Sequence, residues 1–143
     1  MKKIFLMCGR IFISLIFVTA VANEILNWNA THQYFTETLC DWLNHPTLSP
    51  SLQKIFNIML SYSSLLLLLA VIFSGLGGVL VLLGIKVRLG VGLLILFLIP
   101  TTAIMHAFWL YEGAVMEGQM INFLKNLSIL GGLFILASSN GGE

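Results

Sequence analysis

The sequence predicts an all-α polytopic membrane protein, folded as an antiparallel four-helix transmembrane bundle. Three observations predict it: long uncharged apolar spans, a composition poor in charge, and a basic turn that joins two of the spans. Hydrophobic residues make up 58% of the 143 residues and charged residues 9%, and the mean hydropathy is +0.97. A soluble domain carries about 25% charged residues. Because lipid offers backbone N–H and C=O groups no partner, such spans must form helices.

The two clearest spans are residues 64–85 and 89–107, and neither contains Asp, Glu, Lys or Arg. A helix needs about 20 apolar residues to cross a hydrocarbon core of about 30 Å, and both spans meet that length. The basic turn between them, residues 86–88, is short enough only for an antiparallel hairpin. Two further spans, residues 10–27 and 120–137, complete the predicted bundle.

The segment between the first two spans, residues 28–63, is the predicted outer loop. It is polar, is broken by Pro46 and Pro50, and carries aromatic residues, which favour the membrane–water interface. We therefore expect it to lie on the membrane surface as one or two short helices. The whole chain, residues 1–143, has room for this single transmembrane domain and for no separate soluble domain.

The first span has two interpretations. Lys2 and Lys3 before an apolar stretch, with Ala20-Val21-Ala22 as a cleavage pattern, are features of a secretory signal peptide. Arg10 interrupts the apolar run, however, whereas a signal peptide keeps its charge ahead of that run. We expect the helix to be retained because the rest of the bundle needs it. Arg10 then extends its side chain to the membrane boundary.

Small residues predict where helices pack closely, because they let a neighbouring backbone approach. They recur every fourth residue in the second span and form a pair in the fourth: Ala70, Ser74, Gly78, Gly131 and Gly132. The same residues could pack two chains together, so a homo-oligomer stays open. In the third span Pro100 removes one backbone donor and should kink the helix, with Thr101 and Thr102 placed to satisfy the freed carbonyl.

The Lys and Arg residues are sorted by position, and this predicts the orientation in the membrane. With four spans, one side holds five of them and the other side two: Lys2, Lys3, Arg10, Lys86 and Arg88 against Lys54 and Lys125. By the positive-inside rule, both termini are then cytoplasmic in a bacterial inner membrane. Cys8 and Cys40 lie on opposite sides in this topology and cannot form a disulfide within one chain.

This topology gathers unusual polar residues at the outer ends of three spans. The candidate ligand-binding residues are Asn23, Glu24, His106, Trp109, Gln119, Lys125 and Asn126. By the helical period, Gln119, Lys125 and Asn126 share one arc of the fourth helix. His106 and Trp109 share one face at the end of the third. Because ionisable groups within a membrane usually face the bundle interior, these residues predict a pocket between helices near the outer surface.

Each of these residues also has a purely structural interpretation. Lys125 can extend to the lipid headgroups or pair with a nearby glutamate, and Asn126 can link helices by hydrogen bonds. His106 can bond water at the interface, and Trp109 can belong to an aromatic belt there. The sequence leaves these alternatives open.

Several classes of function are disfavoured. The net charge of +1 gives no basic face for nucleic acid, so no nucleic-acid partner is expected. No phosphate-cradling loop and no metal-ligand spacing is present, so no metal site is expected. Without a Cys-x-x-Cys pair, a thiol relay within one chain is also disfavoured.

The order of these features resembles the DoxX family of small four-helix bacterial inner-membrane proteins. The resemblance covers nearly the whole chain except the long outer loop, and its most specific part is the last motif. The residues that carry it are Gly9-Arg10, Gly77-Gly78, Leu82-Leu83-Gly84, Lys86-Val87-Arg88-Leu89, His106-Ala107-Phe108-Trp109, Gly118-Gln119-Met120, Leu124-Lys125-Asn126-Leu127 and Leu130-Gly131-Gly132-Leu133.

The resemblance implies a membrane subunit, since some DoxX relatives belong to quinone-linked sulfur-oxidising or oxidative-stress complexes. Two departures bear on an inherited redox role. Where the family has a Gly-x-x-Lys pattern after the first span, this chain has Val21-Ala22-Asn23-Glu24, which reverses the charge. Where the family often has an acidic residue in the second span, this chain has Ser74.

Two hypotheses of function follow. In the first, the chain is a subunit of a redox complex that meets other membrane or redox proteins in the lipid bilayer and binds a quinone. His106 and Lys125 would then donate hydrogen bonds to a quinone carbonyl. Asn126 and Gln119 would orient the ring, and Trp109 would cover it. In the second, the chain is a non-catalytic scaffold or a small permease-like bundle, and its polar cluster only holds the helices together.

Overall fold

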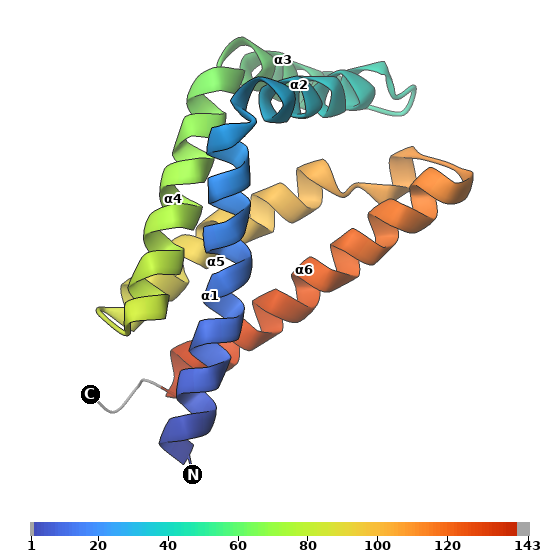
Figure 1. The fold of residues 1–143 in the computed structure, drawn as a ribbon. Helices are drawn as coiled ribbons and strands as arrows, with labels where there is room; N and C mark the ends of the chain where they lie inside the picture. The colour runs from blue at the N-terminus through green and yellow to red at the C-terminus, as the bar shows by residue number, and fades with distance from the viewer. Residues whose placement is uncertain (1, 140–143) are drawn as a thin grey trace.

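The computed structural model describes residues 2–139, and this part of the chain is helical throughout, apart from short turns. Four of its helices are long and apolar enough to cross a membrane. In chain order the elements are α1 (Lys2–Leu26), α2 (Trp28–Asn44), α3 (Pro50–Ser61), α4 (Ser63–Leu83), α5 (Val87–Met105), the 3-10 helix η1 (Phe108–Leu110) and α6 (Gly113–Ser139) (Figure 1). The predicted fold class, a polytopic membrane bundle of α-helices, is confirmed.

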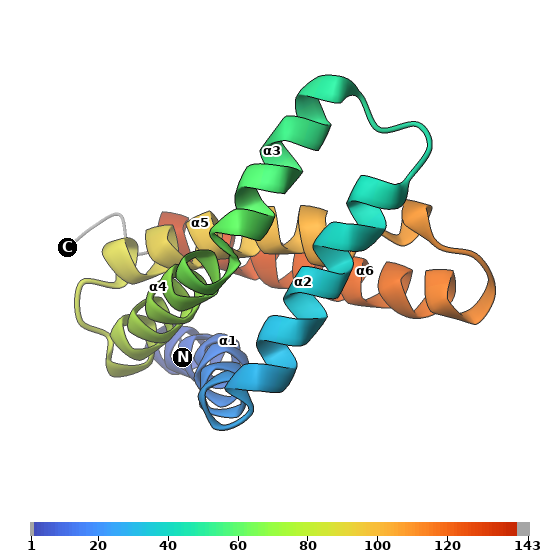
Figure 2. The same ribbon diagram turned by 90° about the horizontal axis from the view of Figure 1, so that it is seen from above.

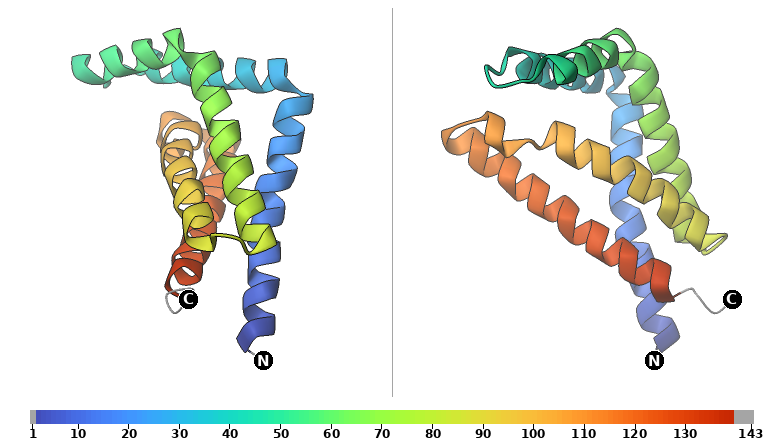
Figure 3. Two further views of the ribbon diagram at one scale, coloured as in Figure 1. Left: turned by 90° about the vertical axis from the view of Figure 1, so that its left-hand side faces the viewer. Right: turned by 180° about the vertical axis from the view of Figure 1, so that it is seen from behind.

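The long helices form two pairs. Helices α1 and α4 stand side by side, and α5 and α6 form a second, inclined layer against them (Figure 3). Helices α2 and α3 form a hairpin that lies across one end of the bundle and passes over α5 and α6 (Figure 2). The start of α1 and the end of α6 lie at the other end (Figure 1).

Helix α1 extends beyond the predicted membrane span, because it begins at Lys2 and continues through Arg10. Most of the predicted outer loop forms two helices, α2 and α3, in line with the one or two short helices expected there. The start of α3 follows from local sequence, because Ser49 accepts a hydrogen bond from the Leu52 N–H and Pro50 occupies the first helical turn.

The core lies where the two layers meet. Its buried residues are Phe17, Val81, Val87, Val91, Leu94, Leu98, Leu133 and Leu136. The apolar residues on the remaining helix faces are exposed, as expected of surfaces that meet lipid.

Glycines bring α4 and α5 unusually close. A Cβ placed on Gly77 would lie 2.9 Å from the carbonyl oxygen of Gly90, and a Cβ on Gly90 would lie 2.9 Å from Val81. The spacing of small residues in the sequence predicts close packing of α4 but does not single out Gly90 in α5. The tight hairpin therefore depends on one glycine from each helix.

The other predicted packing residues have varied surroundings. A Cβ on Gly78 would lie 3.2 Å from Phe17 of α1, and one on Gly132 would lie 3.1 Å from Ile13. Gly131 has nothing within 4 Å at that position. Ser74 is buried and donates to the Ala70 carbonyl at 2.8 Å, so it needs no partner from another helix.

Two residues of the α4–α5 turn have a positive φ, which few residues other than glycine adopt. Gly84 ends α4 in the left-handed region at φ 74°, where a residue without Cβ is favoured. The Ile85 N–H then bonds the Leu80 carbonyl at 3.0 Å and the Gly84 N–H bonds that of Val81 at 3.2 Å, which is a Schellman motif. Lys86 is also left-handed, at φ 45°.

Pro100 lies within α5, which continues as one helix from Val87 to Met105. By the i→i−4 pattern, Pro100 frees the carbonyl of residue 96. Thr102 donates instead to the Leu98 carbonyl, at 2.6 Å. Thr102 therefore does not bond the carbonyl that Pro100 frees, although the sequence predicted that it could.

Candidate functional site

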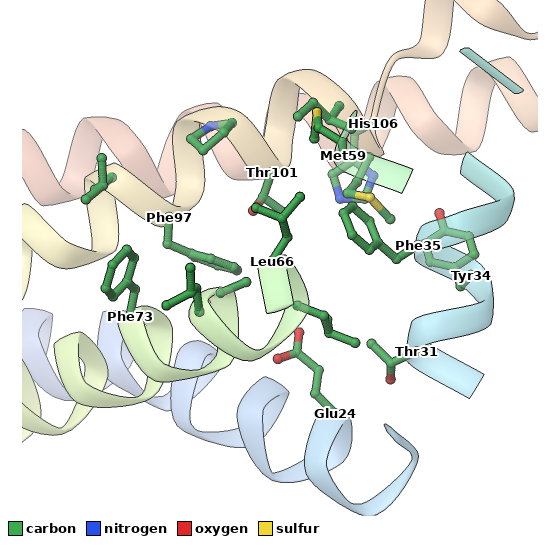
Figure 4. A pocket seen from close by; sticks show the side chains of 17 residues that line it. Glu24, Thr31, Tyr34, Phe35, Met59, Leu66, Phe73, Phe97, Thr101 and His106 are labelled. Carbon is green, nitrogen blue, oxygen red and sulfur yellow. The ribbon is translucent and has the colours of Figure 1, made fainter. Parts of the chain in front are cut away.

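An apolar pocket of about 460 Å³ lies between α4 and α5, beneath α2. Aromatic side chains form much of its wall, and a few polar groups face it (Figure 4). Its labelled lining residues are Glu24, Thr31, Tyr34, Phe35, Met59, Leu66, Phe73, Phe97, Thr101 and His106. Leu69 and Leu96 also line it and are exposed on the outer surface of the bundle, so the pocket reaches the surface that faces lipid.

His106 enters the pocket from the end of α5, where it is the residue that caps the helix. Its Nδ1 lies 2.8 Å from Oε1 of Gln119 in α6. Gln119 in turn donates from Nε2 to the hydroxyl of Tyr34 in α2, at 3.2 Å. Three helices are thereby joined by one chain of hydrogen bonds, which we call the His106–Gln119–Tyr34 chain.

With Oε1 of Gln119 towards the imidazole and Nε2 towards Tyr34, this chain assigns the tautomer of His106. An amide oxygen only accepts, so Nδ1 of His106 must carry the proton that is donated to Gln119. In the neutral ring, Nε2 then bears a lone pair. No residue that the structure describes is hydrogen-bonded to Nε2. In this arrangement Nε2 of His106 is available to the pocket as a hydrogen-bond acceptor.

Glu24 brings a carboxyl group to the same pocket from the last turn of α1 (Figure 4). Its side chain is half-buried and has no hydrogen bond to any described residue. It enters from a different side than His106 does (Figure 4). The pocket thus combines mostly apolar walls with a few polar groups, among which Glu24 and His106 lie well apart. This arrangement suits a mainly apolar ligand with a polar head.

Helix α2 is held over the pocket by side chains at both of its ends. The indole Nε1 of Trp42 donates to the Ile104 carbonyl at 3.0 Å, which satisfies a carbonyl in the last turn of α5. Tyr111 donates to Asp41 at 2.8 Å. Near the start of α2, His32 lies 3.0 Å from the hydroxyl of Ser63 in α4.

Trp109 lies outside the pocket, in an aromatic cluster. Its ring centroid is 6.1 Å from that of Trp42 and 6.0 Å from that of Phe123. Trp42 also stacks on Phe56 of α3, with centroids 4.9 Å apart. The cluster packs η1 against α2 and α6, and Trp109 itself is 48% exposed.

The structure brings some of the predicted site residues together and leaves others apart. Glu24 and His106 line the pocket, and Gln119 is bonded to His106. Asn23 is exposed and accepts from Asn27 at 2.9 Å. Lys125 is exposed and Asn126 is half-buried on α6, and neither lines the pocket. In residues 2–139, no group of three or more His, Cys, Asp or Glu side chains is placed to hold a metal ion.

Sequence reasoning missed the contribution of α2, including Tyr34 and Phe35 in the pocket wall. A signal was present in the sequence. Phe35, Thr38, Leu39 and Trp42 follow the i, i+3, i+4, i+7 spacing of a buried helix face, and Thr38 and Leu39 are buried. Treating residues 28–63 only as an interfacial segment hid this pattern.

Four membrane-crossing helices, a helical hairpin over one end and a pocket between helices define a small polytopic membrane protein. The sequence model of the DoxX family matches residues 5–107, so the chain belongs to the DoxX family. All residues that line the apolar pocket fall within this range. The last motif of the resemblance, residues 118–133, which is its most specific part, lies beyond this range.

A curated relative matches over nearly the whole chain. It is the inner membrane protein YphA of Escherichia coli (strain K12), which is 28% identical over 141 residues. The match covers 99% of this chain and 86% of that protein. No solved structure matches.

Proposed function

We propose that this chain is an inner-membrane subunit that binds a quinone-type molecule from the lipid phase and presents it to a partner redox protein. The observation that carries the proposal is the apolar pocket with His106 at its wall. The inner-membrane location rests on the name of the Escherichia coli relative and on the four apolar helices.

The size and lining of the pocket support a ring-shaped apolar ligand. Pockets for small molecules usually measure about 300–1,000 Å³, and this one measures about 460 Å³. Phe35, Phe73 and Phe97 supply aromatic surface for a ring. The exposed side chains of Leu69 and Leu96 at its edge would let an isoprenoid tail continue into the lipid.

The polar groups support the reduced form of such a ligand. In the tautomer that the His106–Gln119–Tyr34 chain favours, Nε2 of His106 is an acceptor. A quinol hydroxyl is a donor, whereas a quinone carbonyl is an acceptor. This binding mode does not involve Lys125, Asn126 or Trp109, which do not line the pocket.

Binding of decylubiquinol and decylubiquinone to the protein in nanodiscs tests the proposal. We expect the quinol to bind more tightly than the quinone. His106→Phe keeps a ring but has no acceptor nitrogen, so it should weaken quinol binding about tenfold, which corresponds to one lost hydrogen bond of about 1.4 kcal/mol. His45→Phe is the matched control, because His45 lies in the α2–α3 turn and bonds Thr47 rather than the pocket. Absence of binding by the parent protein would refute the proposal.

The alternative, a scaffold without a ligand, is favoured by one observation: the His106–Gln119–Tyr34 chain joins α5, α6 and α2. In that case His106→Phe and Gln119→Leu each break this chain and lower the melting temperature in detergent, and neither the parent protein nor these variants bind the quinol. Mass spectrometry of small molecules that copurify with the protein in mild detergent separates the two functions further.

A further inference from the structure

A second concavity lies at the opposite end of the bundle from the α2–α3 hairpin. It measures about 670 Å³ and is bounded by the start of α1 and by the α4–α5 turn. Four cationic residues line it: Lys3, Arg10, Lys86 and Arg88. We call it the basic pocket. The function proposed above makes no use of it.

These cations have no acidic partner in the described part of the chain. The acidic residues between 2 and 139 are Glu24, Glu37, Asp41, Glu112 and Glu117, and none of them lines the basic pocket. The sixth, Glu143, lies outside the described residues. The Nε atom of Arg10 is buried and has no hydrogen-bond partner there, and its guanidinium lies against Gly84. Within residues 2–139, no carboxylate therefore offsets this concentration of positive charge.

The N-terminus of α5 adds to the same positive potential. The helix begins at Val87, and its preceding residue, Lys86, makes no side-chain capping bond. The first intrahelical bond of α5 is donated by Gly90, to the Lys86 carbonyl at 3.1 Å. The N–H groups of the first turn thus have no partner within the helix, and the helix dipole favours an anion beside them.

We propose that the basic pocket binds a phosphate group with net negative charge, as carried by the headgroup of an anionic phospholipid. Arg10 and Arg88 supply planar donors that match phosphate oxygens, and Lys3 and Lys86 add point charges. Basic pockets between membrane helices bind anionic headgroups on these terms.

The remaining lining favours a lipid as the source of the phosphate. Leu6, Met7 and Leu89 also line the basic pocket. Met7 is 50% exposed and Leu89 is 53% exposed, so acyl chains could lie against them while the headgroup meets the cations. A free phosphate ion would gain nothing from these apolar side chains.

The test compares binding of short-chain phosphatidylglycerol and phosphatidylcholine to the full-length protein in mild detergent. We expect the parent protein to bind phosphatidylglycerol at least about tenfold more tightly, with an affinity that falls as salt is added. The double variant Lys86→Gln, Arg88→Gln should lose this preference. Both side chains are exposed, so the fold should survive their replacement, and a melting curve without lipid checks this.

Three further arms complete the experiment. The matched control is Lys54→Gln, Lys125→Gln, which removes the same charge from two exposed residues outside the basic pocket and should keep the preference. Arg88→Lys with Lys86 intact should retain most of the preference for phosphatidylglycerol, because the charge stays.

Inorganic phosphate is titrated alone as a further arm. If phosphate binds to the parent protein but not to the Lys86→Gln, Arg88→Gln variant, the basic pocket is a phosphate site whose ligand is a soluble ion. Equal binding of both lipids with no phosphate binding, or equal loss in both double variants, overturns the proposal.

Discussion

The contact between Tyr111 and Asp41 illustrates how single residues hold the α2–α3 hairpin in place. Tyr111 follows η1, and its hydroxyl donates to the Asp41 carboxylate of α2 at 2.8 Å. Burial of the phenol raises the pKa of Tyr111, and the bond to Asp41 and the negative charge of that carboxylate raise the pKa further. The phenol is thus held in its neutral form, in which it can donate.

The first prediction concerns alkaline pH. The pKa of Tyr111 is higher in the folded protein than in the unfolded chain, so this bond stabilises the fold fully below about pH 10, the pKa of a free tyrosine. Its contribution decreases as the pH rises above that value. In a Tyr34→Phe, Tyr62→Phe background, absorbance at 295 nm should report Tyr111 ionising later than a free tyrosine.

Asp41→Asn provides the control for this measurement, because it keeps an acceptor oxygen while removing the charge. We expect Tyr111 to ionise at lower pH in this variant, yet still later than a free tyrosine, since burial remains. An unchanged titration curve would show that Asp41 does not act on the phenol.

At the scale of elements, the pairing of α4 with α5 depends on backbone contact. Gly77 and Gly90 each leave space that the other helix fills, and neither can accept a Cβ without a shift of the neighbouring helix. Because lipid is as apolar as the helix surface, close van der Waals packing of this kind is a main source of helix association in membranes.

The second prediction tests this packing. Gly90→Ala places a Cβ 2.9 Å from Val81 and 3.0 Å from the Gly77 carbonyl, so the hairpin must open slightly. We expect a loss of about 1–3 kcal/mol in stability, the usual cost of overpacking, seen as a lower melting temperature in mild detergent. Gly92→Ala is the matched control in the same helix. A Cβ there meets nothing within 4 Å, so its melting temperature should stay level or rise.

These two helices also show how far the sequence could predict the structure. The uncharged runs of α4 and α5 identify both spans and their antiparallel order, because length, lipid and a short turn leave one solution. The helical period also shows which side chains share a face. It does not show which neighbour that face meets, since crossing positions depend on contacts such as Gly77 with Gly90.

The same limit applies to the candidate site: the sequence predicts which side chains share a helix face, but not which helix that face meets. Glu24, His106 and Gln119 were predicted as neighbours, and the structure places two of them in the pocket and bonds the third to His106. Lys125 and Asn126 share the predicted arc of α6, but the pocket is bounded by α2 and α4 rather than by their part of α6. No pattern in the sequence indicated directly that α2 and α4, rather than this part of α6, would bound the pocket.

For the whole molecule, the two ends differ in chemistry. One end carries the basic pocket, with Lys3, Arg10, Lys86 and Arg88. The other carries the α2–α3 hairpin, with its aromatic cluster and with the acidic residues Glu37 and Asp41. Since α1 starts and α6 ends at the basic end, the positive-inside rule predicts that both termini face the cytoplasm (Figure 1).

The third prediction tests this orientation with the two cysteines of the chain. Cys8 lies near the start of α1, and Cys40 is exposed on α2 at the other end. Single-cysteine proteins made by Cys8→Ser and Cys40→Ser are treated with a membrane-impermeant maleimide in intact bacterial cells. We expect Cys40 to be labelled from outside and Cys8 only after lysis. Because Cys8 is half-buried, it reacts more slowly with the maleimide. Its labelling in intact cells is therefore compared with its maximum labelling in lysed cells. The reverse pattern would invert the orientation, and labelling of both from outside would contradict an even number of crossings.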